Sequence, residues 1–232
     1  MLREISLFSL NSKYCYIHPL EKLGIVLISL ISCSYTNNQY MILGNIVFFI
    51  ILNIIAKNPF TVIKRFIGIT STFFIFTAIT LLWQRTPIEY IILLALRVLN
   101  GAFSIAFLSL TTPINHLVYL FSRSEVLRDI GDIIKSMERF LIIIEDDFSL
   151  TFRAIKSRGG FGSFKSSIKD FGIGCGIVFK NLINRWKDIN MSMKNRCYSG
   201  RYNYSYCFKV SKIQVIGIII YVFIVIFFNI YL

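Results

Sequence analysis

The sequence predicts an all-α membrane protein with about five transmembrane helices and a cytoplasmic region of two long crossed amphipathic helices. Three features of the composition lead to this class. Of the 232 residues, 55% are hydrophobic and only 16% are charged, whereas soluble globular chains carry about 25% charged residues. Basic residues are in excess, with 25 Lys and Arg against 12 Asp and Glu. The five cysteines form neither a disulfide framework nor a metal spacing. These features exclude a secreted disulfide domain, a disordered tail and a compact soluble enzyme.

Five apolar stretches approach the roughly 20 residues that a helix needs to cross a hydrocarbon core of about 30 Å. In chain order they are residues 20–35, 40–56, 66–83, 90–110 and 213–232. The last is the clearest because it carries no charge, and the first is the shortest, so its full crossing is left open. No small-residue cleavage site follows the first stretch, and we therefore expect no signal peptide.

Basic residues in the connections predict the orientation, because cytoplasmic connections carry an excess of Lys and Arg. The segment before the first span and the connection at 57–65 are basic, and residues 111–212 hold seventeen Lys and Arg against nine Asp and Glu. The connections at 35–39 and 84–89 carry no net charge. We therefore expect a multi-pass protein of the cell membrane with a cytoplasmic N-terminus and an outside C-terminus.

The net charge of +13 follows from this bias and from the attraction of basic segments to anionic lipid. A nucleic-acid-binding protein would also need a basic face interleaved with aromatic residues and a recognisable module, and the sequence contains neither. The lipid bilayer is therefore the expected partner of the basic residues, and nucleic acid is not.

The chain divides into a membrane region (residues 1–110), a cytoplasmic region (residues 111–212) and a C-terminal span (residues 213–232). The sequence Leu-Thr-Thr-Pro at 110–113 ends the fourth span as it leaves the membrane. The next residues, 114–122, are predicted to form one short helix.

Two long amphipathic helices are predicted within the cytoplasmic region. Apolar residues recur at steps of three and four over residues 124–156 and again over 164–193, which is the period of a helix with one apolar face. Three alternate glycines at 172–176 allow another helix to approach closely, and residues 141–144 are all apolar. We therefore expect the two helices to cross near their middles. Without a preceding strand, the glycine pattern does not indicate a phosphate loop.

The two predicted helices end in similar local sequences, in which Lys is followed by a small or polar residue, then Arg, and soon an aromatic residue. The first end contains Ser157, Arg158 and Gly159, and the second contains Asn195, Arg196 and Cys197. A single Arg at a helix C-terminus is explained by the helix macrodipole, which it stabilises by about 0.3–1 kcal/mol. Two such ends also suit two copies of one partner, or two related partners, each pairing a carboxylate with an Arg. This arrangement indicates an anchor rather than a catalyst.

Several segments besides the helix ends point to one known family. They are His-Pro-Leu-Glu-Lys at 18–22, Leu-Arg-Val at 96–98 and Leu-Ser-Leu-Thr-Thr-Pro at 108–113. With the two Arg-bearing ends, they make the chain resemble the transmembrane component of energy-coupling factor transporters, the CbiQ/EcfT family, which includes cobalt-transport proteins. The family carries Ala-Arg-Gly at these ends. The first end differs by Ser for Ala, and the second keeps Arg but has Asn for Ala and Cys for Gly.

The resemblance implies a non-catalytic subunit of an ATP-driven importer. In this family the helix-end arginines insert into grooves of two ABC-type ATPase subunits, and the chain also holds a small membrane subunit that binds the substrate. ATP-driven closing of the ATPases is thought to spread the coupling helices and to topple that subunit. Because ATP is bound by the ATPases, this chain is expected to hold no cofactor or metal. The substrate is cobalt or nickel in one branch and a vitamin in another, and the short chain with its Thr-Thr-Pro favours the cobalt branch.

Two other functions are left open by the residues themselves. A self-sufficient channel or secondary transporter would use the spans as its path, and the short spans with few charges disfavour it. An intramembrane enzyme would need a cluster of His, Asp or Glu at membrane depth, and the spans contain no such cluster.

A few further residues have two interpretations. Arg97 is a charge within the fourth span, which costs about 2.5–3.5 kcal/mol at a bilayer centre. Either it makes a fixed structural contact with neighbouring helices or it reaches toward the outer interface. His18 and His116 have no Cys, Asp or Glu at ligand spacing, so both are interpreted as packing residues. The acidic run at 145–147 is interpreted as a solvated or salt-bridged face rather than an ion site.

Overall fold

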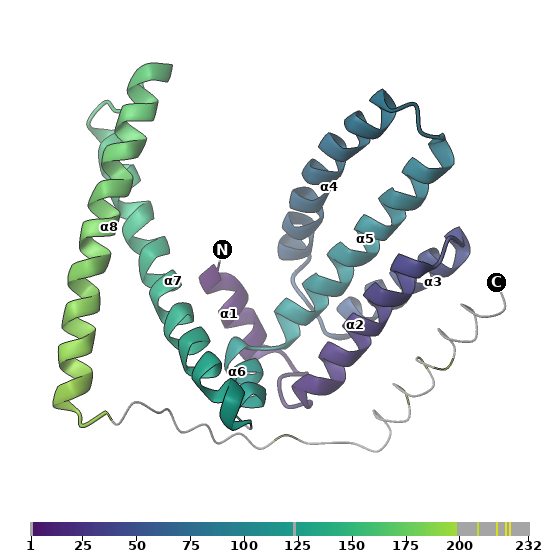
Figure 1. The fold of residues 1–232 in the computed structure, drawn as a ribbon, viewed down its shortest axis with the longest axis horizontal. Helices are drawn as coiled ribbons and strands as arrows, with labels where there is room; N and C mark the ends of the chain where they lie inside the picture. The colour runs from purple at the N-terminus through teal and green to yellow at the C-terminus, as the bar shows by residue number, and fades with distance from the viewer. Residues whose placement is uncertain are drawn as a thin grey trace. The chain divides into compact units, whose positions relative to one another are not determined.

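The computed structural model describes residues 2–122 and 124–198 together with Phe208, Gly217, Tyr221 and Phe223. Over these residues the structure is entirely helical, with eight helices and no strand (Figure 1). The prediction of an all-α protein is therefore confirmed for the described residues. The predicted span 213–232 lies almost wholly outside them.

The described residues form two compact units. The first contains residues 3–120 and the four described positions near the C-terminus, and the second contains the two longest helices. The helices of the first unit are α1 (Leu2–Asn11), α2 (Pro19–Tyr35), α3 (Gln39–Ile55), α4 (Phe60–Trp83), α5 (Ile88–Thr111) and α6 (Ile114–Ser122), the last of which reaches the boundary between the units.

Five of these helices correspond to predicted helices, and four of them match closely. Helices α2, α3, α5 and α6 begin and end within two residues of their predicted bounds. Helix α4 begins at Phe60, six residues earlier than predicted. Pro59 is its N-cap residue, with φ −67° and an extended ψ of 117°, and the helix begins directly after it. Lys64 and Arg65 therefore lie inside the helix rather than before it.

Helix α1 was not predicted, because its residues read as polar and mixed. An acidic residue, Glu4, lies in its first turn, where the helix dipole favours negative charge. Ile5 packs against a buried apolar cluster of α4 and α5, and Glu4 forms an exposed ion pair with Arg65 at 2.9 Å. Tertiary contacts therefore hold this short helix in place.

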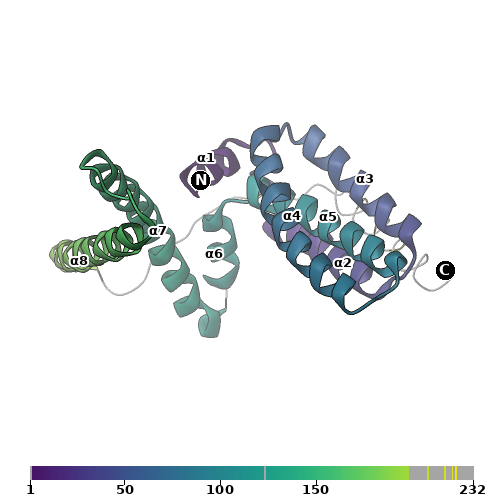
Figure 2. The same ribbon diagram turned by 90° about the horizontal axis from the view of Figure 1, so that it is seen from above.

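Helix α5 is the centre of the first unit, because α2, α3 and α4 all pack against it (Figure 1, Figure 2). Its buried face includes the small residues Ala102, Ser104 and Ala106, which let neighbouring helices approach closely. Phe49 of α3 and Leu110 of α5 are fully buried between these helices. The core of the first unit therefore follows the length of α5.

Helices α4 and α5 are each long and apolar enough to cross a membrane, and α3 is a shorter apolar helix. The outer face of α4 leaves large apolar side chains uncovered, and Phe73, Phe76 and Trp83 are 75%, 67% and 89% exposed. An apolar surface of this length is what lipid tails cover in a membrane protein. These helices support a membrane location, and the number of crossings stays a prediction.

The second unit is an antiparallel pair of helices, α7 (Glu125–Ser157) and α8 (Phe164–Asn195), joined by a short turn (Figure 1). Both lie where the apolar period predicted long helices. Near the turn, Gly174 of α8 packs against Phe152 and Ile155 of α7. Farther along, Arg185 of α8 pairs with Asp147 of α7 at 2.8 Å. The interface therefore extends along the helices.

The prediction that the three glycines at 172–176 meet residues 141–144 at a central crossing is wrong. A Cβ on Gly174 would meet the Phe152 ring at 2.9 Å, whereas a Cβ on Gly172 or Gly176 would meet no atom of another helix within 4 Å. In an antiparallel pair joined by a short turn, each residue faces one that is about equally far from the turn. Gly174 therefore lies opposite the last turns of α7 and not opposite its middle.

Candidate functional site

The first candidate site is the C-terminus of α7, which closes in a Schellman motif. Gly159 N–H donates to the Lys156 carbonyl at 3.2 Å, and Gly160 N–H donates to the Ile155 carbonyl at 3.0 Å. These bonds satisfy carbonyl groups that a helix end leaves without an intrahelical partner. Arg158 is the C-cap residue, with φ −90° and ψ 14°, and it is exposed. The motif therefore fixes the backbone from which the exposed Arg projects.

The C-terminus of α8 closes in the same motif. Cys197 N–H donates to the Lys194 carbonyl at 3.0 Å, and Tyr198 N–H donates to the Met193 carbonyl at 3.1 Å. Arg196 is the C-cap residue with φ −93° and ψ 17°, nearly the same angles as in the first end, and it is also exposed. The repeated local sequence is therefore a repeated local structure.

The residue after each Arg takes a left-handed backbone conformation, and the two ends differ in how easily they do so. Gly159 has φ +82°, a region that glycine enters without steric cost. Cys197 has φ +53°, where the left-handed conformation costs an ordinary residue roughly 1–2 kcal/mol. Cys197 therefore closes the second cap with the same geometry as Gly159 closes the first, but with strain that glycine does not carry.

The turn that follows the first end is braced by α8. The Asp170 Oδ2 atom accepts hydrogen bonds from Phe161 N–H at 2.9 Å and from the Ser166 hydroxyl at 3.1 Å. A Cβ on Gly160 would meet Ile155 Cγ2 at 2.5 Å and the Ile155 carbonyl oxygen at 2.8 Å. Only glycine fits this position, so the turn is held against both helices.

The remaining predicted residues, Ser157 and Asn195, each precede the Arg by one position. The Ser157 hydroxyl donates to the Ala154 carbonyl at 2.9 Å, and Asn195 is exposed. All six predicted residues therefore lie at helix ends, but the two groups are far apart. Helix α8 has 32 residues, and at 1.5 Å per residue it separates the two ends by about 48 Å along its axis.

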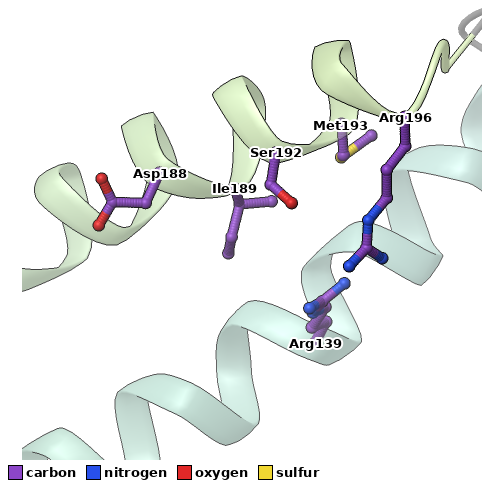
Figure 3. A pocket seen from close by; sticks show the side chains of 6 residues that line it. All are labelled: Arg139, Asp188, Ile189, Ser192, Met193 and Arg196. Carbon is purple, nitrogen blue, oxygen red and sulfur yellow. The ribbon is translucent and has the colours of Figure 1, made fainter.

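The second end also borders a groove of about 270 Å³ between α7 and α8. The groove is lined by Arg139, Asp188, Ile189, Ser192, Met193 and Arg196. Figure 3 shows the Arg139 and Arg196 side chains pointing toward one another from the two helices, with Asp188 at the other end of the groove. Both arginines are exposed. The sequence analysis did not identify Arg139.

Arg97, the predicted charge within a span, is half-buried and reaches the connection between α2 and α3. Its Nη2 donates to the Thr36 carbonyl at 3.0 Å and to Asn37 Oδ1 at 3.3 Å. This connection is one of those predicted to lie outside the membrane. Arg97 therefore makes fixed contacts, as one interpretation predicted. It makes them at the end of the bundle that holds the α2–α3 connection, toward which the other interpretation predicted that it would reach.

A buried lysine lies where α5 ends. Lys22 is only 3% exposed, and its Nζ donates to the Thr111 carbonyl at 2.7 Å and to the Tyr14 carbonyl at 2.5 Å. A cation at this place satisfies a carbonyl of the α5 C-terminus and complements its dipole. From the sequence, Lys22 was taken as part of the basic N-terminal segment and of the motif at 18–22. The structure shows that it also ties that segment to the end of α5.

His116 and Cys15 lie beside this lysine. The Cys15 Sγ atom is 4.0 Å from His116 Nε2, and the Phe208 ring packs edge-on at 4.9 Å between ring centroids. Burial and the positive charge of Lys22 lower the pKa of His116. Burial raises the pKa of Cys15, although the charge of Lys22 opposes this. Both side chains are therefore neutral at pH 7 and serve as packing residues.

A second buried polar cluster joins α2, α3 and α5, and the sequence analysis missed it. Asn100 is fully buried, and its Nδ2 lies 3.3 Å from Ser29 Oγ and 3.2 Å from Cys33 Sγ. Asn45 Nδ2 lies 3.3 Å from the same sulfur, and the Tyr221 hydroxyl donates to Asn45 Oδ1 at 3.0 Å. Side-chain bonds between helices in a membrane contribute roughly 0.6–2 kcal/mol each, so this cluster fixes the helix positions.

Among the residues that the structure describes, no three His, Cys, Asp or Glu side chains converge as a metal site. His18 caps α2, since its Nδ1 accepts a hydrogen bond from Leu20 N–H at 3.3 Å. In the acidic run at 145–147, Asp147 is 7% exposed and is paired with Arg185. The interpretation of this run as a salt-bridged face is confirmed for Asp147.

The structure combines apolar helices of membrane-spanning length with a helical hairpin. Each helix of the hairpin ends in an exposed C-cap Arg. These features are those of a helical membrane protein. Residues 16–206 match the family described as CbiQ, cobalt transport protein, and the chain belongs to this family. The resemblance found in the sequence is thereby confirmed. The chain is a component of a cobalt transport system, a class of system that generally includes ATPase partners.

Two relatives show how far the similarity extends. Over 217 residues the chain is 27% identical to a protein of Methanocaldococcus jannaschii named uncharacterized protein MJ1089, an alignment that covers 82% of this chain and 79% of the relative. Over 115 residues it is 28% identical to the putative fused cobalt transport protein CbiMQ of Methanocorpusculum labreanum. That alignment covers 50% of this chain and 19% of the fused protein.

Proposed function

We propose that the chain is the transmembrane coupling component of an energy-coupling factor importer. Five spans would place the N-terminus and the α7–α8 hairpin in the cytoplasm and the C-terminus outside. The hairpin would join two ABC-type ATPase subunits, and the membrane bundle would hold a separate substrate-binding subunit. The ATPases would bind ATP, and the complex would import cobalt, nickel or a vitamin. The chain itself would carry out no catalysis.

The repeated cap is the observation that carries this proposal. Arg158 and Arg196 occupy equivalent positions in two Schellman motifs with nearly identical C-cap angles. Each cap fixes the backbone from which the guanidinium projects, and a guanidinium pairs with a carboxylate through two parallel hydrogen bonds. Two such ends, held about 48 Å apart by α8, suit two ATPase subunits that bind side by side.

The hairpin also leaves apolar surface that a partner would cover. Large side chains are exposed on both helices, and these include Val126 (84%), Ile133 (59%), Met137 (54%), Phe164 (83%), Ile168 (62%) and Trp186 (54%). Many large apolar side chains exposed on one element favour a contact with protein or membrane. This exposure supports a coupling element that works inside a larger assembly.

The test is charge reversal at both ends. The double variant Arg158→Glu with Arg196→Glu is expected to abolish co-purification with the ATPase subunits and to leave membrane insertion intact, because a carboxylate socket repels the new charge. The matched control is Arg153→Glu with Lys180→Glu, which reverses two exposed charges on the same helices away from the caps.

Retention of the ATPases and continued uptake by the double Arg variant would show that the coupling assignment is wrong. Transport by the purified chain alone in liposomes, without an ATPase, would instead favour a self-sufficient channel or secondary transporter. In either case the family membership would stand, and the mechanism would have to be assigned anew.

A further inference from the structure

We propose that the groove at the second end binds a carboxylate side chain of an ATPase subunit between Arg139 and Arg196. Arg139 would then be a second binding residue of this end, supplied by the other helix of the hairpin. This inference rests on the proposed coupling function and adds the chemistry of one of its two contacts.

Among the described residues, neither guanidinium group forms an ion pair, and the one carboxylate that lines the groove, Asp188, lies at its other end. The two guanidinium groups point toward one another across the groove (Figure 3), and the ion pairs of the hairpin's described residues join other side chains. Two cations held close together repel unless an anion lies between them. The cap fixes the backbone at Arg196 and α7 fixes it at Arg139, so both guanidinium groups can reach one carboxylate from opposite sides of the groove.

The walls of the groove favour a protein side chain over a phosphate group. Ile189 and Met193 supply apolar lining, which suits the methylene groups of a Glu or Asp. Asp188 lies at the other end of the groove (Figure 3), and its charge opposes a multiply charged phosphate more than a single carboxylate. Ser192 adds a hydroxyl that can donate to a carboxylate oxygen.

The first end differs from the second in its described surroundings. The acidic residue nearest to its turn, Asp170, is held by Phe161 N–H and the Ser166 hydroxyl, and Arg158 is the only arginine of that cap. The two ends therefore differ in their side chains, because the second presents two guanidinium groups across a groove and the first presents the guanidinium of its C-cap Arg.

The experiment measures how much ATPase the full chain retains in the purified transporter as the NaCl concentration rises. Arg139→Glu is expected to weaken retention at least roughly tenfold, as expected for lost hydrogen bonds to a charged group. Arg139→Lys should weaken it less, because the charge remains while the two-pronged geometry is lost. Arg139→Ala should make retention less sensitive to salt. The control Arg153→Glu, an exposed Arg outside the groove, should change neither quantity.

The outcomes separate this inference from the function on which it rests. If Arg158→Glu with Arg196→Glu releases the ATPases but Arg139→Glu retains them at every salt concentration, the groove does not bind the partner and the inference is wrong. If both variants retain the ATPases, the coupling function fails as well. If Arg139→Glu acts in nanodiscs of phosphatidylglycerol but not of phosphatidylcholine, the ligand is a lipid phosphate, and the inference is again overturned.

Discussion

The two ends of the helical hairpin share a backbone and differ in their surroundings. Both close in a Schellman motif with an Arg at the C-cap and a left-handed residue after it. The first end has glycine at the left-handed position and a turn braced by Asp170. The second has Cys197 at that position and Arg139 across the groove. Local sequence thus determines the cap, and the partner helix determines the charge and rigidity around it.

Of the single substitutions at the two ends, Gly160→Ala is expected to have the largest effect on the stability of its turn. The new Cβ would lie 2.8 Å from the Ile155 carbonyl oxygen, so the turn must shift, at a cost of about 1–3 kcal/mol by analogy with overpacking. Hydrogen exchange of the Phe161 amide should become faster, because its rate rises as the free energy of opening the turn falls. Gly162→Ala is the control, since its Cβ would meet only the Gly159 carbonyl at 3.9 Å. Equal exchange rates of the Phe161 amide in the two variants would show that the contacts of Gly160 and Asp170 do not hold the turn.

A smaller and reciprocal effect is expected at the left-handed positions. Gly159→Ala should destabilise the first cap by about 1 kcal/mol, and Cys197→Gly should stabilise the second by a similar amount. Hydrogen exchange of the Gly160 and Tyr198 amides, which close the two motifs, measures each change directly. The same sign in both variants would show that the two caps do not share one conformation.

Much of the fold could be predicted because it depends on local patterns. The apolar period placed α7 and α8, and the long apolar stretches placed α2, α3 and α5 within two residues. Helix α1 could not be predicted, since its position depends on packing of Ile5 against distant helices. The contact of the glycines with α7 was wrongly predicted because it also depends on packing between two helices. Nothing in the spacing showed that only Gly174 faces α7.

The residues of the candidate site also divide into those that local sequence predicts and those that depend on packing between helices. Arg158 and Arg196 were predicted because each lies at the end of a helix that the apolar period predicts, within a local sequence that occurs at both ends. Arg139 could not be predicted, because it lies in the middle of α7, and only the antiparallel packing brings it beside the end of α8. Lys22 and Asn100 were missed because their partners lie on other helices.

The central claim is that both hairpin ends lie in ATPase subunits of the assembled transporter. Cys197 is an exposed thiol next to Arg196, and Cys15 and Cys33 are buried. With Cys175 and Cys207 replaced by Ser, a thiol-linked photo-cross-linker at Cys197 would report the neighbours of the second end. A variant with Ser157→Cys and Cys197→Ser would report those of the first end.

The account predicts that each position forms adducts with an ATPase subunit in the full complex. A third position, Lys180→Cys with Cys197→Ser, lies on an exposed stretch of α8 away from the ends and should form far fewer. Adducts with ATPase at neither end, or equally at position 180, would contradict the account.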